Sequence, residues 1–274
     1  MSWLEIVAFV LLGFATGTYG TLVGVGGGLI IVPVLLFLHV APKEAAGTSM
    51  AVVLANAASG AWSYHRQRII DLRAGLIFAL AGLPGAILGG YADQFVPRRG
   101  FGLGFGLFLA LMSLRLFLSR RTNVGESTPP EPAPTQTAST QPARSTPSKI
   151  ATPSAAWLAA CLGFVVGFLA SMLGIGGGIA YVPGMVYLFH YLPHAATATS
   201  TFIIALTAIF ATASHAYYGD VLWGPAVAIA VGAVAGAQLG ARLARNVASE
   251  GLMRLFGVAV LGTSIWLIYS NAAK

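Results

Sequence analysis

Charged residues are scarce in this sequence. Asp, Glu, Lys and Arg make up only 8% of the 274 residues, whereas hydrophobic residues make up 57%. An ordinary soluble domain carries roughly a quarter charged residues. The composition therefore excludes a soluble globular protein and predicts an all-α integral membrane protein whose main partner is the lipid bilayer.

The sequence also lacks the residue clusters that most enzymes and metal proteins need. Its one cysteine, Cys161, lies in an apolar run, so neither a disulfide framework nor a cysteine metal site is available. No nucleophile with an accompanying base is recognisable. No Lys-Ser or Lys-Thr follows the glycine clusters, as it does in a nucleotide-binding loop. We therefore expect no enzymatic activity, no metal and no cofactor.

The net charge is +7, but the basic residues sit in short loops between apolar segments. They indicate membrane topology rather than a surface for nucleic acid. The carboxylates avoid the centres of the apolar segments, and Asp71, Asp93 and Asp220 fall near segment ends or in loops. This position argues against proton-relay carboxylates and favours a small anionic substrate. The coupling ion, proton or sodium, stays open.

Apolar segments predict the transmembrane helices, and the second half of the chain repeats the first. The segments cover residues 3–19, 29–40, 45–64, 74–92 and 101–119, then 155–170, 179–190, 195–217, 224–243 and 251–269. Residues 120–153 are rich in Pro, Ser and Thr and predict a disordered linker. The chain thus divides into a first transmembrane repeat (1–119), the linker (120–153) and a second repeat (154–274), with eight to ten membrane segments.

The two halves align at an offset of 150 residues, which becomes 151 after one inserted residue. The matches include Pro42, Thr48 and Ser49 with Pro193, Thr199 and Ser200, and Gly85 and Gly89 with Gly236 and Gly240. Isolated glycines such as Gly85 and Gly236 are expected to serve close helix packing.

The distribution of basic residues predicts the orientation of the repeats. If the broken pair of segments at the start of each half enters the membrane and returns, the repeats are inverted. Eleven of the 15 Lys and Arg then share one side, against nine for parallel repeats. The positive-inside rule favours the inverted arrangement, with the linker in the cytoplasm and both termini outside. The expected location is the plasma membrane, the inner membrane in a bacterium.

The sequence Gly-Val-Gly-Gly-Gly at 24–28 returns as Gly-Ile-Gly-Gly-Gly at 174–178. Consecutive glycines break a helix, and backbone of this kind is tolerated at membrane depth only within protein or beside a watery cavity. Residues 29–40, at ~1.5 Å per residue, span only ~18 Å of a ~30 Å hydrocarbon core, which predicts a half-helix. Whether the broken pair spans the bilayer or is re-entrant stays open.

The glycine clusters are the first candidate substrate site. Their backbone N–H groups and the N-terminus of the restarting helix could hold an oxyanion, although close packing would also use small residues. The candidate glycines are Gly24, Gly26, Gly27, Gly28, Gly174, Gly176, Gly177 and Gly178.

Polar side chains in the apolar segments are further candidates. Hydroxyl groups can hold an anion without a buried charge, although helix capping is the alternative for them. The candidate hydroxyls are Thr48, Ser49, Thr199 and Ser200, with Thr21 and Ser171 weaker. Asn56 and Gln238 could contact substrate or bond between helices, and His215 could serve a proton or a polar contact.

The doubled glycine cluster followed by Pro33 and Pro183, and the Pro-then-Thr-Ser pattern of the next segment, resemble the sulfite exporter TauE/SafE family. This resemblance implies a permease for sulfite, sulfonates or related organosulfur anions. We expect a secondary transporter that works by alternating access around the glycine breaks, with export as the expected direction. An anion channel of the same architecture and a membrane assembly factor are the alternatives, and the protein could be a monomer or a homodimer.

Overall fold

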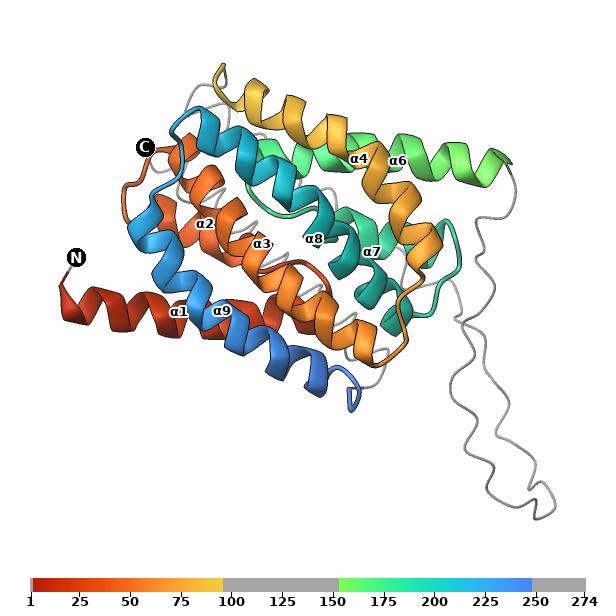
Figure 1. Ribbon diagram of the computed structural model, residues 1–274, viewed down its shortest axis with the longest axis horizontal. Coiled ribbons are helices and arrows are strands. Elements are labelled where there is room, and N and C mark those ends of the chain that lie inside the picture. The colour runs from red at the N-terminus through yellow and green to blue at the C-terminus, as the bar shows by residue number, and fades with distance from the viewer. Residues whose placement is uncertain (1, 96–152, 248–274) are drawn as a thin grey trace, which may run out of the picture.

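The computed structural model describes residues 2–95 and 153–247, which form helices connected by short loops (Figure 1). The helices are α1 (Trp3–Val23), α2 (Gly28–Phe37), α3 (Pro42–Arg66), α4 (Leu72–Asp93), α6 (Pro153–Leu173), α7 (Gly178–Tyr187), α8 (Pro193–Tyr217) and α9 (Trp223–Leu243). No strand occurs among these residues, so the predicted all-α class is confirmed.

Each apolar segment predicted within the described residues is a helix, with ends shifted by a few residues. The predicted segments 101–119 and 251–269 and the linker up to residue 152 lie outside the described residues. Pro153, assigned to the linker from the sequence, is instead the first residue of α6. Proline is well tolerated there because the first helical N–H has no partner within the helix.

Five helices in the described part of the chain are long and apolar enough to cross a membrane: α1, α4, α6, α8 and α9. The apolar α2 has 10 residues and, at ~1.5 Å per residue, reaches only ~15 Å. The predicted half-helix is therefore present. Helix α3 is long enough to cross but carries buried polar groups such as Thr48, Ser49 and Asn56, which suits a helix enclosed by others.

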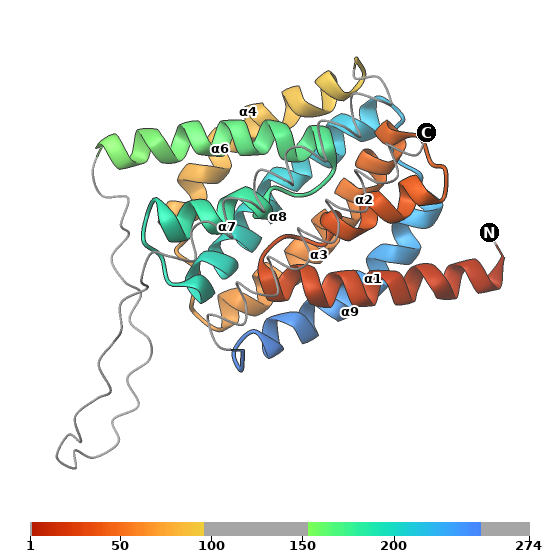
Figure 2. The same cartoon turned by 180° about the vertical axis from the view of Figure 1, so that it is seen from behind.

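Helices α3 and α8 lie side by side in the middle of the bundle, with the pair α1 and α9 on one flank and the pair α4 and α6 on the other (Figures 1 and 2). Each flanking pair joins one helix of the first half to one of the second. Their close approach requires glycine: a Cβ at Gly85 would lie 2.2 Å from the Phe164 carbonyl oxygen, and one at Gly236 would lie 2.2 Å from that of Phe14. The predicted packing role of these glycines is confirmed.

Equivalent helices of the two halves run in opposite directions. Helix α1 begins at the end of the bundle marked N, whereas α6 begins at the opposite end (Figure 1). Two matched hydrogen bonds follow the repeat: the Leu222 N–H donates to Thr48 Oγ1 over 3.0 Å, and the Asp71 N–H donates to Thr199 Oγ1 over 3.1 Å. The inverted membrane topology stays a prediction, since the last segment of each half lies outside the described residues.

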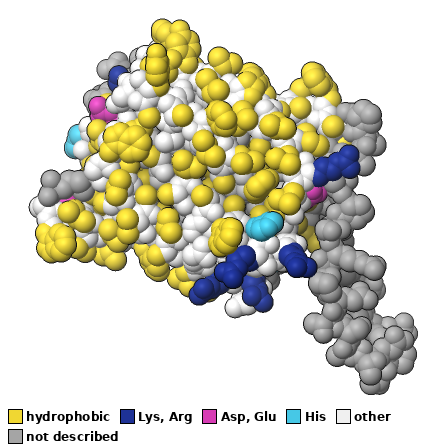
Figure 3. All heavy atoms as spheres, viewed as in Figure 1, with side chains coloured by type: hydrophobic (Ala, Val, Ile, Leu, Met, Phe, Trp, Pro, Cys, Tyr) yellow, Lys and Arg dark blue, Asp and Glu magenta, His cyan; other side chains and the backbone are white. Residues whose placement is uncertain are grey.

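The visible outer face of the bundle is largely hydrophobic, and Lys and Arg gather toward its lower edge (Figure 3). Large apolar side chains such as Leu80, Trp157 and Val231 are exposed by more than half. An apolar surface of this extent suits contact with lipid. The described arginines at the ends of α3, α4 and α9 are Arg66, Arg68, Arg73, Arg242 and Arg245.

Candidate anion site at the paired helix breaks

Both glycine clusters interrupt a helix, as the sequence predicts. Helix α1 ends at Gly24 in the left-handed conformation (φ 82°), and α2 begins after Gly27, which is also left-handed (φ 86°). The second break repeats this geometry, with Gly174 at φ 71° and Gly177 at φ 83°. A side chain at these positions would be strained. The glycine pattern therefore sets the backbone path of each break.

The two breaks touch each other at the centre of the bundle. A Cβ at Gly28 would lie 2.4 Å from the Gly174 carbonyl oxygen, and a Cβ at Gly178 would lie 2.0 Å from the Gly24 carbonyl oxygen. Gly28, the first residue of α2, thus packs directly on the end of α6, and Gly178, the first residue of α7, packs directly on the end of α1. These two glycines have a packing role whatever else they do.

The serine hydroxyls hold the breaks together. Ser49 Oγ donates to the Gly174 carbonyl oxygen over 2.6 Å, and Ser200 Oγ donates to the Gly24 carbonyl oxygen over 2.9 Å. Thr48 and Thr199 accept the backbone bonds described above. All four candidate hydroxyls therefore bond to the opposite half in this conformation.

The backbone N–H groups of the first cluster are partly used. Val25 and Gly26 donate to the Gly20 carbonyl oxygen over 2.8 and 3.2 Å, which closes the end of α1. The N-termini of α2 and α7, by contrast, are both uncapped, because their N-cap residues Gly27 and Gly177 provide no side-chain cap. Two uncapped helix N-termini, each with partial positive charge, consequently lie near the centre of the bundle.

Asn56 directs a free amide group at the first break. Its Oδ1 accepts a 3.2 Å hydrogen bond from Thr21 Oγ1, while its Nδ2 has no hydrogen-bond partner among the described residues. Asn56 is only 1% exposed, and its Nδ2 lies 3.7 Å from the position of a Cβ on Gly27. A buried amide donor without a partner is costly, so this group is available for an anion at the α2 N-terminus.

Ser171 lies at the second break, where it corresponds to Thr21 of the first half at the offset of 150 residues. It is fully buried, and its Oγ has no partner among the described residues. Together with Gly176 and Thr207, Ser171 lines a small cavity. The space that the centre of a water molecule can occupy in it is about 10 Å³. The cavity has room for about one water molecule. Ser171 is thus a stronger candidate than the sequence alone indicated.

Apolar side chains separate the two polar regions. The Cγ1 of Val53 would lie 3.2 Å from a Cβ on Gly26 and 2.9 Å from one on Gly176, and the Cγ2 of Ile204 would lie 3.4 Å from each. These two side chains come from the central helices α3 and α8. They fill the space between the breaks in this conformation.

The remaining predicted polar residues have other surroundings. Gln238 Nε2 donates to the backbone oxygen and to the hydroxyl of Ser59, over 2.9 and 2.8 Å, so it joins α9 to α3. His215 is fully buried, and its Nε2 lies 3.0 Å from the Ser171 carbonyl oxygen. His215 therefore contacts the second break directly, whereas the hydrogen bonds of Gln238 go to Ser59.

Two carboxylates near helix ends are buried, although the sequence predicts only that they lie near segment ends. Asp93 is 3% exposed and Asp220 is 2% exposed. Their positions at segment ends were predicted correctly, but position along the chain does not reveal burial. A signal was available in the repeat, because Asp93 and Asp220 align with the apolar residues Ala244 and Ile69.

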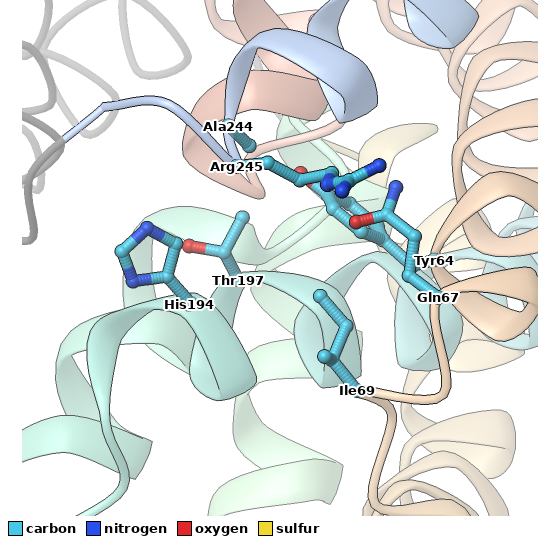
Figure 4. A pocket seen from close by; sticks show the side chains of 7 residues that line it. All are labelled: Tyr64, Gln67, Ile69, His194, Thr197, Ala244 and Arg245. Atoms are coloured by element: carbon cyan, nitrogen blue, oxygen red, sulfur yellow. The ribbon is translucent and has the colours of Figure 1, made fainter. Parts of the chain in front are cut away.

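A second cavity lies at the other end of the bundle, where α3 and α9 end and α8 begins (Figure 4). It is lined by Tyr64, Gln67, Ile69, His194, Thr197, Ala244 and Arg245. The side chains of Arg245 and Gln67 lie close together over Tyr64 (Figure 4). None of these described lining residues is a carboxylate and Arg245 is positively charged, so the field of the described residues suits the approach of an anion.

Comparison with known proteins gives a family match. The family model of the sulfite exporter TauE/SafE matches residues 9–267. The chain belongs to this family. The probable membrane transporter protein YunE of Bacillus subtilis is 34% identical and covers 98% of this chain and 99% of its own. A probable membrane transporter protein of Xylella fastidiosa is 30% identical, covering 96% of this chain and 94% of its own. No solved structure gives a significant match.

Membership of this family, together with these relatives, supports a membrane transporter. The described residues contain no group of three or more His, Cys, Asp or Glu side chains arranged to hold a metal ion. Neutral donors and uncapped helix N-termini lie at the breaks, and these groups suit the binding of an anion.

Proposed function

We propose that this protein is a secondary transporter that exports small sulfur oxyanions, sulfite or organosulfonates, across the bacterial inner membrane. The family name supports the substrate class. The observation that carries the proposal is the contact between two helix breaks, each with an uncapped half-helix N-terminus beside an unpartnered buried polar group, Asn56 or Ser171. The alternatives remain an anion channel and an assembly factor without transport activity.

Neutral donors explain how an anion could be held here without a buried Lys or Arg. A partially positive helix N-terminus and one amide donor offset the loss of water around the anion. They avoid the cost of burying a counter-charge when the site is empty. The glycines supply close backbone approach, since no side chain covers the N–H groups.

The closed path favours a carrier over an open channel. Val53 and Ile204 fill the space between the breaks, and the cavity beside Ser171 admits about one water molecule. An anion could therefore enter only after the halves move relative to each other. The matched bonds of Ser49 and Ser200 are contacts that such a motion would exchange. We propose that the linker lies in the cytoplasm, because the positive-inside rule assigns the arginine-rich end of the described bundle to that side. A monomer or a homodimer would both contain the complete pair of breaks.

The first experiment measures uptake of sulfite and sulfoacetate into proteoliposomes containing the purified protein. We expect saturable uptake by the unaltered protein. Asn56→Asp should reduce the initial rate at least tenfold, because it replaces a donor with a negative charge beside the anion. Ser171→Ala should raise the half-saturating concentration. Thr18→Ala is the matched control, since the Thr18 hydroxyl bonds within its own helix, to the Phe14 carbonyl oxygen.

Three other results would contradict the proposal. Unsaturable flux would indicate a channel. Undiminished uptake by a folded Asn56→Asp variant would remove the first break from the binding site. An absence of uptake for every sulfur oxyanion tested would remove the substrate class.

A further inference from the structure

A cluster of charged and polar side chains lies at the end of the bundle where α3 begins and where α4 and α8 end. Lys43 Nζ lies 3.6 Å from Asp220 Oδ1, and Gln94 Nε2 donates to Asp220 Oδ2. Asp93 lies within electrostatic range of both Asp220 and Lys43. The two carboxylates share one lysine, whose side chain is half exposed.

His215 faces this cluster from α8. The Ser171 carbonyl oxygen can only accept a hydrogen bond, so the proton of the neutral imidazole must be on Nε2. His215 Nδ1 then presents a lone pair, and it lies 4.0 Å from Asp220 Oδ2, which is also an acceptor. Neither Nδ1 nor Asp93 Oδ2 has a hydrogen-bond partner in the described residues. One added proton would convert this contact between acceptors into a favourable one.

The other end of the bundle provides an internal comparison. At the offset of 151, the residues that correspond to the cluster line the cavity of Figure 4. There Lys43, Asp93, Gln94, His215 and Asp220 are replaced in order by His194, Ala244, Arg245, Tyr64 and Ile69. Tyr64 keeps the bond to the equivalent backbone position, donating to the Thr21 carbonyl oxygen over 2.8 Å. The same fold is thus built at one end without either carboxylate.

The carboxylates therefore meet a need other than folding. Burying two carboxylates with a single lysine is costly, and apolar Ile69 and Ala244 occupy the equivalent positions. From this geometry we infer that Asp93 and Asp220, with His215, bind a proton that is coupled to substrate movement. The inference rests on the proposed transport function and names its coupling ion.

The cluster is connected to the second break by direct contacts. His215 links Asp220 on one side to Ser171 on the other, through its two ring nitrogens. A Cβ at Gly47 would lie 2.5 Å from the Asp220 carbonyl oxygen and 3.0 Å from the Cβ of His215, so α3 packs tightly on this link. A proton taken up by the cluster reduces the negative charge that faces Lys43, and the half-exposed Lys43 side chain can then turn toward water. The proton thus releases the contact that closes this end of the bundle.

The test uses methanesulfonate, a sulfonate that stays ionised across the physiological pH range, in proteoliposomes with and without a pH difference of one unit. Export driven by proton entry exchanges one proton for one anion, so an interior one pH unit more acidic than the outside supports about tenfold accumulation inside when the membrane potential is clamped at zero. We expect this accumulation in the unaltered protein and its loss in Asp93→Asn and Asp220→Asn, which should still exchange labelled for unlabelled methanesulfonate. Glu44→Gln is the matched control, because it removes a neighbouring carboxylate that lies outside the cluster. Asp93→Ala introduces the side chain found at the equivalent Ala244, so it tests the same loss in a variant that the fold accommodates.

A second readout needs no transport. Infrared titration of the detergent-solubilised protein should show a protonated-carboxyl band that Asp93→Asn or Asp220→Asn removes and Glu44→Gln retains. Saturable methanesulfonate uptake that ignores the pH gradient would overturn the proton site and leave the transporter intact. If no sulfur anion is transported, the proposed function fails, and the infrared band alone decides: its presence supports the proton site and its absence overturns it.

Discussion

Glycine serves two different physical purposes within five consecutive residues. Gly24, Gly26 and Gly27 have positive φ, whereas Gly28 is helical and is glycine because the Gly174 carbonyl oxygen leaves no room for a Cβ. The sequence pattern predicts one candidate anion-binding cluster, with close packing as the alternative for all of these glycines. The structure separates residues that shape the backbone from a residue that lets the two breaks meet.

A substitution at the helical glycine of the second break tests this distinction. Gly178→Ala places a Cβ 2.0 Å from the Gly24 carbonyl oxygen, and overpacking of this kind costs about 1–3 kcal/mol or more. We expect a clear fall in the melting temperature of the detergent-solubilised protein. Gly184→Ala is the control, because the added Cβ would meet only the flexible end of Leu162 at 2.8 Å. Equal melting temperatures for the two variants would contradict the packing role.

At the scale of the helix, the two breaks are equivalent elements that pack on each other and connect the two halves of the chain. The half-helices α2 and α7 are short, and each begins against the other half of the chain. A half-helix of ten residues gains little stability from its own hydrogen bonds. Its position must therefore come from packing on the other half of the chain, as Gly28 does on Gly174 and Gly178 does on Gly24. The bonds of Ser49 and Ser200 to the carbonyl oxygens of Gly174 and Gly24 fix the chain just before each half-helix.

Removal of these hydroxyls should lower stability. Ser49→Ala and Ser200→Ala each lose one buried hydrogen bond to a carbonyl oxygen, which costs about 1 kcal/mol. The measurement is thermal unfolding, with Thr18→Ala expected to remain close to the unaltered protein. Unchanged stability combined with weaker substrate binding would show that the hydroxyls contact substrate instead.

For the whole molecule, the described helices place the start of α1 and the start of α6 at opposite ends (Figure 1). The end of α2 returns to the end where α1 begins, since α3 starts there. This arrangement is the one expected of a broken pair that enters the membrane and returns rather than crossing it. The membrane orientation that follows can be tested directly.

Single cysteines in a Cys161→Ser background report this topology. We expect Ser2→Cys and Lys43→Cys to react with a membrane-impermeant maleimide added outside intact cells. Arg68→Cys and Ser154→Cys should react only after the membrane is opened, because they lie at the end carrying most of the arginines. Labelling of Ser2→Cys and Ser154→Cys from the same side would exclude inverted repeats.

The sequence by itself determined the membrane class, the duplication, the two breaks and the half-helices, because these depend on local hydrophobicity and on glycine. Only the tertiary structure decided which polar groups lack partners, since partners such as Ser49 and Gly174 lie 125 residues apart. It raised Ser171 above its sequence ranking and gave Gln238 an interhelical bond. It also buried Asp93 and Asp220, because burial at a helix end depends on what the other half of the chain places over it.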